Sequence, residues 1–130
     1  MKYYKYRIYF EDTDAQGLVY YANYLKFYER ARTDFLRDLE LWQSKLATES
    51  TLQFVVKKFN INYIAPAKFD DMIDVYVNIV KINNFSIEMS QKIMIKNVVI
   101  NDAYFKIACI SSKNFKLKTI PQNIKKILSN

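Results

Sequence analysis

The sequence predicts an α+β fold in which an antiparallel sheet packs against one long helix. Apolar residues recur at helical spacing in a single long segment, between residues 24 and 45. Several other segments alternate apolar and polar residues, which is typical of strands with one buried face. Most of these strands are joined by tight turns, which favour antiparallel pairing. At 130 residues, a single domain spanning residues 1–130 is expected.

The first predicted strand lies at the N-terminus, where four apolar side chains alternate with mostly charged ones: Tyr4, Tyr6, Ile8 and Phe10. After a turn around Gly17, the apolar stripe of the helix begins: Tyr24, Phe27, Tyr28, Ala31, Phe35 and Leu39. Asn23 is a favourable N-cap for this helix. The helix is predicted to continue to about Lys45, where the polar stretch ATEST interrupts the pattern.

Four further strands and a short helix are predicted after the long helix. The strand over residues 52–63 switches its apolar face at Lys57 and Lys58, which indicates a β-bulge. Three more apolar faces follow on residues 73–79, 85–91 and 103–109, with turns at Asn83-Asn84 and near Asn97. Pro121 is predicted to open the last helix, because proline is favoured at the first helical position.

Residue types that are missing exclude several kinds of chemistry. The chain has no histidine, which excludes Ser-His-Asp and Cys-His nucleophiles and makes a zinc site improbable beside the lone Cys109. One glycine excludes Gly-rich phosphate loops. We therefore expect no metal and no cofactor, and an acid or base drawn from carboxylates, lysines and tyrosines. The single cysteine and the lack of an 18-residue apolar run favour a cytoplasmic protein without membrane insertion.

The charge and the aromatic content both bear on partners. A net charge of +7 fits a polyanionic partner, such as nucleic acid, an acidic carrier protein or a phosphorylated cofactor, and equally fits a solvated lysine surface. Nucleic acid is disfavoured, because the aromatic residues fall on core positions of the strands and the helix. The 11 tyrosines and 9 phenylalanines exceed what one small core holds, which indicates a homo-oligomer.

The segment between the first strand and the long helix is the predicted reaction centre. It holds the only glycine of the chain, Gly17, which suggests a backbone that needs positive φ or very close approach. Asp12 and Asp14 precede this glycine, and the start of the helix follows it. By themselves the two aspartates would more commonly be turn residues that accept local hydrogen bonds.

The same segment carries a resemblance to a known family. Residues 9–24, YFEDTDAQGLVYYANY, and residues 27–32, FYERAR, resemble the hot-dog-fold acyl-CoA thioesterases. They are similar to the 4-hydroxybenzoyl-CoA thioesterase group and most closely to the YbgC-type enzymes associated with the Tol–Pal system. The likeness extends over nearly the whole chain, since FVV at residues 54–56 and YIAPA at residues 63–67 also fit.

This resemblance implies a hot-dog fold, a five-stranded antiparallel sheet wrapped around the long helix. It also implies dimers, often paired into homotetramers, with active sites at subunit interfaces that hydrolyse acyl-CoA to acid and free CoA. The catalytic carboxylate of the family falls on Asp14, and the backbone N–H that polarises the thioester carbonyl falls on Tyr21. YbgC-type sequences commonly have histidine at this last position, which leaves the role of the backbone amide unaffected.

Physical chemistry supports assigning these two roles to Asp14 and Tyr21. Hydrolysis of a thioester needs a base or nucleophile near the carbonyl carbon and a hydrogen-bond donor for the developing oxyanion. Asp14 can supply the first as nucleophile or as general base, and the start of the helix supplies the second. The residues expected to contact the substrate are Gly17, Tyr20, Val56, Lys57 and Lys58.

The leading hypothesis is therefore an acyl-CoA thioesterase for short-chain, medium-chain or aromatic acyl groups. The alternative is a catalytically idle hot-dog module that binds acyl carrier protein or a membrane-biogenesis partner. An intact Asp14 argues against the idle module, because a retired site has no need of that carboxylate.

Overall fold

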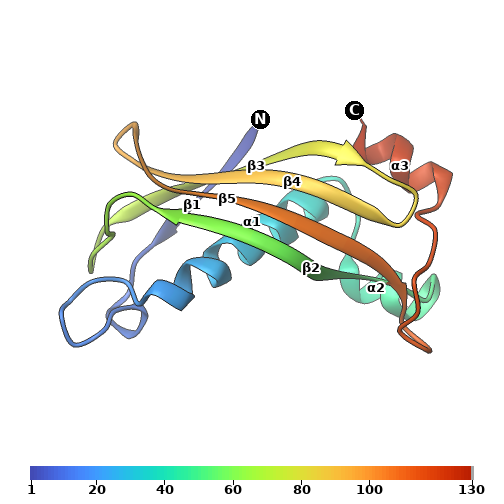
Figure 1. Cartoon of the computed structure of the whole chain (residues 1–130), viewed down its shortest axis with the longest axis horizontal. Coiled ribbons are helices and arrows are strands. Elements are labelled where there is room, and N and C mark those ends of the chain that lie inside the picture. Colours follow the sequence, from blue (N-terminus) through green and yellow to red (C-terminus); the bar gives the residue numbers. More distant parts are fainter. Residues whose placement is uncertain (130) are drawn as a thin grey trace.

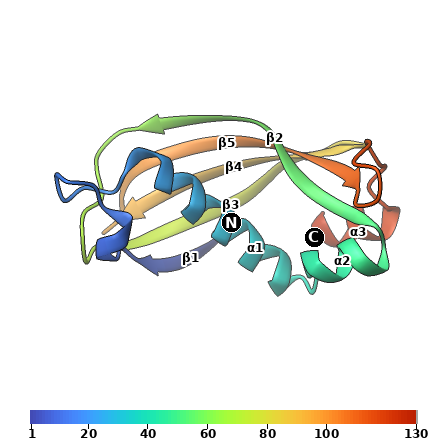
Figure 2. The ribbon, with the colours of Figure 1, turned by 90° about the horizontal axis from the view of Figure 1, so that it is seen from below.

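Five strands pair into one antiparallel sheet, whose order is β1-β3-β4-β5-β2. The computed structural model describes residues 1–129. A long helix, α1, lies across one face of the sheet, and the sheet curves around it (Figures 1 and 2). The predicted α+β architecture is therefore confirmed. The element bounds are β1 (Lys2–Arg7), α1 (Tyr24–Asp38), α2 (Gln43–Glu49), β2 (Leu52–Tyr63), β3 (Met72–Ile82), β4 (Ser86–Ile95), β5 (Val98–Ser111) and α3 (Gln122–Leu128).

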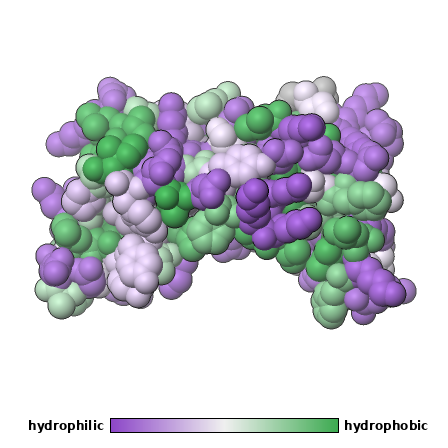
Figure 3. Space-filling view, in the orientation of Figure 1, coloured by the Kyte–Doolittle hydropathy of each residue, from purple (hydrophilic) through white to green (hydrophobic). Residues whose placement is uncertain are grey.

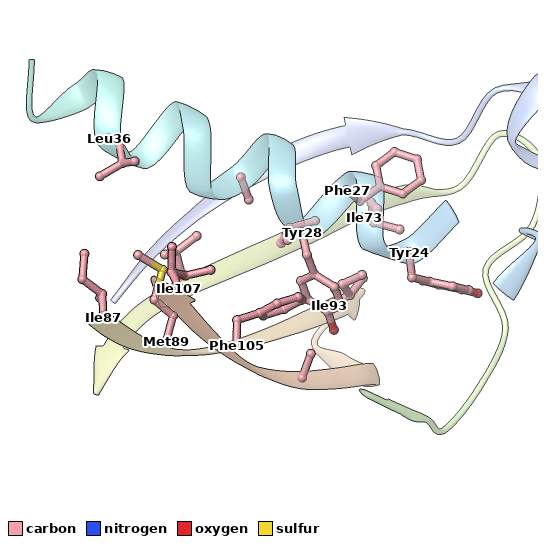
Figure 4. Close-up of a cluster of buried hydrophobic side chains, with 14 of the residues drawn as sticks. Tyr24, Phe27, Tyr28, Leu36, Ile73, Ile87, Met89, Ile93, Phe105 and Ile107 are labelled. Atoms are coloured by element: carbon pink, nitrogen blue, oxygen red, sulfur yellow. The ribbon is translucent and has the colours of Figure 1, made fainter. Parts of the chain in front are cut away.

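The core lies between α1 and the inner face of the sheet (Figure 4). Successive turns of α1 bury their apolar side chains because these recur at helical spacing. The ring of Tyr28 meets that of Phe105 edge to face, with 5.4 Å between centroids. Fully burying one such side chain contributes about 1.5–3 kcal/mol. The inner face of the sheet supplies Ile73 from β3, Ile87, Met89 and Ile93 from β4, and Phe105 and Ile107 from β5.

The predicted bulge in β2 is confirmed, since the register with β5 shifts between Val56 and Lys58. Lys57 is the extra residue, so the apolar alternation changes face there. The turn between β4 and β5 has positive φ at both Lys96 (47°) and Asn97 (66°), as two-residue hairpins of the favoured twist require. Two further register shifts, with extra residues at Val80 of β3 and Ile100 of β5, are not visible in the sequence pattern.

The long helix ends earlier than predicted, at Asp38 instead of about Lys45. The N–H of Leu41 donates to the carbonyl of Leu36 at 2.8 Å, and the N–H of Glu40 to that of Arg37 at 2.8 Å. These two bonds form a Schellman motif, in which Glu40 takes the left-handed conformation with φ 62°. Glycine is usual there, so a glutamate gave no signal in the sequence. The prediction was wrong because a separate helix, α2, carries the remaining helical residues.

Replacing Glu40 by glycine is expected to stabilise the protein by about 0.5–1 kcal/mol, because a left-handed conformation costs a non-glycine residue about 1–2 kcal/mol and the added chain entropy offsets part of this. Thermal and urea unfolding measure the difference. The control is Lys26→Gly, on the exposed side of α1, which is expected to destabilise by about 1 kcal/mol. An equal loss of unfolding free energy in both variants would contradict the proposed backbone strain at Glu40.

Two predictions near the N-terminus were also wrong. Phe10 is not in the first strand, because the chain turns into a 3-10 helix over Phe10–Asp12, and Phe10 is 76% exposed. Asn23 makes no capping hydrogen bond, because a preceding 3-10 turn, Tyr21–Asn23, already has helical geometry. At the C-terminus, Pro121 immediately precedes α3, one residue from its predicted place. No helix within residues 1–129 is long and apolar enough to cross a membrane.

Candidate active site

The loop between β1 and α1 folds back on itself as a tight hairpin. Thr13 and Val19 form a β-bridge, the N–H of Asp14 donates to the carbonyl of Leu18 at 2.8 Å, and that of Gly17 to Asp14 at 3.0 Å. Gly17 has φ +79°, as predicted, and a Cβ there would meet no atom within 4 Å. The glycine is therefore favoured by the backbone conformation. No neighbouring atom of the chain would exclude a larger residue.

This hairpin is fixed to the body of the protein. Leu18 forms a β-bridge with Lys68, and the N–H of Val19 donates to the carbonyl of Ala67 at 2.9 Å. The N–H of Ala67 in turn donates to the hydroxyl of Tyr24, the first residue of α1, at 3.0 Å. The loop, the segment after β2 and the start of α1 are thus held in one position relative to each other.

The two aspartates have different surroundings. The carboxylate of Asp12 accepts a hydrogen bond from the N–H of Tyr9 at 2.8 Å. The backbone carbonyl of Asp12 accepts one from the side-chain amide of Asn23 at 2.9 Å. Asp12 therefore holds the turn, as expected. One carboxylate oxygen of Asp14 accepts the N–H of Gln16 at 2.9 Å, and within residues 1–129 the other accepts no hydrogen bond. Asp14 is exposed, so this oxygen is available to a ligand.

Tyr21 begins the 3-10 turn that leads into α1. Its N–H has no acceptor within the turn and donates to no other group of residues 1–129. The carbonyl of Tyr20, in the same peptide unit as this N–H, accepts the N–H of Asn23 at 2.8 Å, which fixes the orientation of the peptide unit. The dipole of α1 adds partial positive charge at this end. The N–H of Tyr21 is therefore a free, oriented donor.

Asp14 and Tyr21 line the same cavity, whose volume is about 340 Å³. Tyr20, the other predicted contact at this end, lies beside it with its ring centroid 4.7 Å from that of Tyr21. The sequence did not indicate that the end of β2 would complete the cavity. Its walls are Asp14, Leu18, Val19, Tyr21, Tyr24, Tyr63, Ile64, Ala65 and Pro66.

Within residues 1–129, Asp14 is the only carboxylate that lines this cavity. Burial raises the pKa of Tyr24, and the nearby Tyr63, Asp71 and Asp14 raise it further, against the opposing effect of the hydrogen bond from Ala67. Burial also raises the pKa of Tyr63, and Tyr21 adds to the effect. Phenols ordinarily titrate near pH 10, so these two remain protonated. Any proton acceptor in the cavity must then be Asp14.

The three predicted contact residues on β2 lie away from Asp14 within one chain. Lys57 is roughly 20 Å from Tyr63 along the strand, at about 3.3 Å per residue. Val56 lines a separate cavity of about 280 Å³ between α1 and the sheet. Lys57 lines a third hollow, of about 350 Å³, with Lys81 and Lys106, and Lys58 is exposed. The structure therefore does not gather them with Asp14.

Comparisons with known proteins agree with this fold. The family model described as the thioesterase-like superfamily matches residues 8–128. The chain belongs to this superfamily. It is 40% identical over 119 residues to the acyl-CoA thioesterase YbgC of Haemophilus influenzae, covering 92% of this chain and 88% of the relative.

Solved structures show the same architecture. A hypothetical protein from Aquifex aeolicus superposes with a TM-score of 0.92 at 28% identity, covering 98% of this chain and 99% of that one. A probable thioesterase from Bartonella henselae gives 0.88 at 32% identity, covering 92% and 98%. The hot-dog fold and the resemblance to YbgC-type thioesterases, both predicted from the sequence, are confirmed.

Proposed function

We propose that this protein is an acyl-CoA thioesterase in which Asp14 and the N–H of Tyr21 act on the thioester group. One observation carries the proposal: a carboxylate oxygen without a partner and a backbone donor without an acceptor line the same cavity. These are the two parts that acyl transfer needs. The activity named for the YbgC relative, at 40% identity, supports the same reaction for this chain.

In the proposed mechanism, the thioester oxygen accepts the hydrogen bond from Tyr21, which stabilises the negative charge that develops during attack. One such donor contributes about 3 kcal/mol. Asp14 either attacks the carbonyl carbon, forming an acyl-enzyme that water hydrolyses, or takes the proton of an attacking water. In both routes the carbon–sulfur bond breaks and the thiol of CoA leaves.

The free edge of β2 supports a homo-oligomer. β2 ends the sheet order, so over 12 residues one side of its backbone has no partner strand. Val55, Val56 and Phe59 are 40–44% exposed along it. A long apolar edge of this kind is a template for pairing with another chain. We propose that two copies pair along β2 into a dimer, or a dimer of such dimers.

Pairing along β2 would also explain the separation of the predicted site residues. In an antiparallel pair of identical strands, the middle of each strand lies beside the middle of its partner, and each end lies beside the opposite end. The partner's Val56 and the partner's Lys57 would then lie nearer to Tyr63, which lines the Asp14 cavity. The proposed site is therefore shared between subunits.

The hollow beside Lys57 suits the phosphates of CoA, because Lys81 and Lys106 also line it and outnumber its one carboxylate, Glu88. Replacing Lys57 and Lys58 together by alanine is expected to raise KM for acyl-CoA severalfold with little change in kcat, since charge-assisted phosphate contacts contribute uniform binding. Steady-state kinetics at two salt concentrations measures this, because salt weakens such contacts. The control is Lys26→Ala on α1. An unchanged KM at low salt would show that Lys57 and Lys58 do not bind the phosphates of CoA.

A panel of thioesters tests the proposed function directly. Short-chain, medium-chain and aromatic acyl-CoAs, and an acyl carrier protein thioester, are incubated with the protein while a thiol reagent reports the released thiol. Release from at least one acyl-CoA, absent with Asp14→Asn, is expected. A folded protein that releases no thiol from any of them would favour the catalytically idle module, which no observation on this structure otherwise supports.

A further inference from the structure

A positive charge is buried in the core without a carboxylate at ion-pair distance among residues 1–129. This charge belongs to Arg32 on α1, which is 7% exposed. Its Nη1 donates to Oε1 of Gln91 at 3.0 Å, and its guanidinium lies 4.2 Å from the ring centroid of Phe105. Burial lowers the pKa of Arg32 to about 10, against the opposing effect of the negative charge of Glu29, so the side chain stays charged at neutral pH. Buried charges are normally paired, which makes this one unusual.

Arg32 lines the cavity between α1 and the sheet, of about 280 Å³. A guanidinium has five N–H donors, and within residues 1–129 Arg32 donates only to Gln91. Two other polar residues of the wall, Thr33 and Gln43, bond to each other at 3.1 Å. The rest of the wall is apolar apart from Glu29: Leu36, Phe54, Val55, Val56, Ile87, Met89 and Ile107.

Glu29 lines the same cavity, and its negative charge would oppose an anionic ligand. Glu29 is exposed, however, whereas Arg32 is buried. Charges in water are screened, and those in the interior act at a much lower dielectric constant. The field inside the cavity is therefore dominated by the guanidinium.

We propose that this cavity holds an aliphatic chain that ends in a carboxylate, with Arg32 binding the carboxylate and the apolar wall binding the chain. Guanidinium and carboxylate match in a two-pronged geometry, and the pair would neutralise the buried charge. Two ligands carry this chemistry. One is the ω-carboxyl acyl group of a thioester, which rests on the proposed function, and the other is a free fatty acid.

The location of the cavity fits the first ligand. It lies beside the free edge of β2, since Val55 and Val56 form part of its wall. Within one chain, Arg32 is roughly 16 Å along the helix from Tyr21 at about 1.5 Å per residue, with the rings of Tyr28, Phe105 and Phe59 packed between. Pairing along β2, as proposed above, would bring the cavity of one subunit closer to the Asp14 cavity of the other. Figure 3 shows the surface hollowed along its lower border, between the lobe of the Gly17 loop and the lobe of α2.

The kinetic arm compares adipoyl-CoA with hexanoyl-CoA, which differ only in the carboxylate at the far end. An apolar cavity without a cation would disfavour the charged end of adipoyl-CoA, because a carboxylate is costly to desolvate. Because Arg32 binds this carboxylate in the proposal, the wild-type kcat/KM for adipoyl-CoA is expected to equal or exceed that for hexanoyl-CoA. In Arg32→Met, the ratio of the two kcat/KM values is expected to fall at least tenfold. Lys26→Met, on the exposed side of α1, is the matched control and should keep the wild-type ratio. The wild-type ratio is informative even if Arg32→Met fails to fold.

The binding arm titrates octanoate and octanol into the wild-type protein and into Arg32→Met by calorimetry. Octanoate binding that octanol does not reproduce, and that the variant loses, supports the free fatty acid as ligand even without an adipoyl preference. A wild-type enzyme that prefers hexanoyl-CoA at least tenfold and binds no octanoate would overturn the proposal. Failure of the whole acyl-CoA panel would instead refute the proposed function, and the binding arm would still decide the Arg32 site.

Discussion

Replacing Asp14 by asparagine is expected to abolish thioesterase turnover while the fold and substrate binding stay nearly intact. Asparagine keeps a side-chain oxygen for the hydrogen bond from Gln16, which is 2.9 Å long, so the Gly17 hairpin should persist. The change removes the charge, and with it the ability to attack a carbonyl or to accept a proton from water. Loss of proton transfer alone lowers kcat by about 10²–10⁴-fold. Steady-state hydrolysis of the best acyl-CoA of the panel measures the loss.

The matched control for this variant is Asp12→Asn, two residues away and with the same change in charge. The carboxylate of Asp12 accepts the N–H of Tyr9, and an asparagine oxygen can do the same, so most of the activity should remain. Thermal unfolding of both variants separates lost chemistry from lost structure. Near-normal kcat in Asp14→Asn, or an inactive Asp12→Asn that is still folded, would show that the catalytic assignment is wrong.

Replacing Phe59 by lysine should convert the proposed dimer into monomers and remove most of the activity. Phe59 lies in the second half of β2, 42% exposed, where a charge on an edge strand opposes pairing with another chain. A site shared between subunits loses its geometry when they separate, and a displacement of about 1 Å can cost about 10²-fold in rate. Light scattering at micromolar concentration gives the mass, and the acyl-CoA assay gives the rate.

Val80→Lys is the control for this experiment. Val80 is 57% exposed and lies on β3, which β4 and β5 separate from β2 in the sheet. A lysine there should leave the assembly and the activity unchanged. Phe59→Lys also loses a stacking contact with Phe105, whose ring centroid is 5.9 Å away. Such a contact contributes about 0.5–1.5 kcal/mol to stability. The stability of both variants is therefore checked by thermal unfolding. A wild-type protein of 15.5 kDa mass in solution would refute both the dimer and the shared site.

The sequence alone determined the features that depend on neighbours along the chain. Alternation with period 2 identified the strands, and a change of face identified the bulge at Lys57, because each residue of a strand points to the side opposite to its neighbour. The single glycine marked a turn with positive φ, since this conformation is costly for other residues, but the same conformation at Glu40, Lys96 and Asn97 carried no such mark. The DxD pattern before Gly17 placed Asp14 on that turn, and the structure leaves one of its oxygens free.

Only the tertiary structure decided which distant segments meet. Tyr63 follows Tyr21 by 42 residues, yet its hydroxyl donates to the carbonyl of Tyr21 and both residues line the same cavity. The end of α1 depended on Glu40 in a conformation usually taken by glycine, which the contact of the buried Leu36 and Leu41 makes tolerable. The helical stripe likewise gave no sign that Arg32 is buried against Phe105. Periodicity records which face of an element is apolar, whereas the register and curvature of the sheet decide what that face meets.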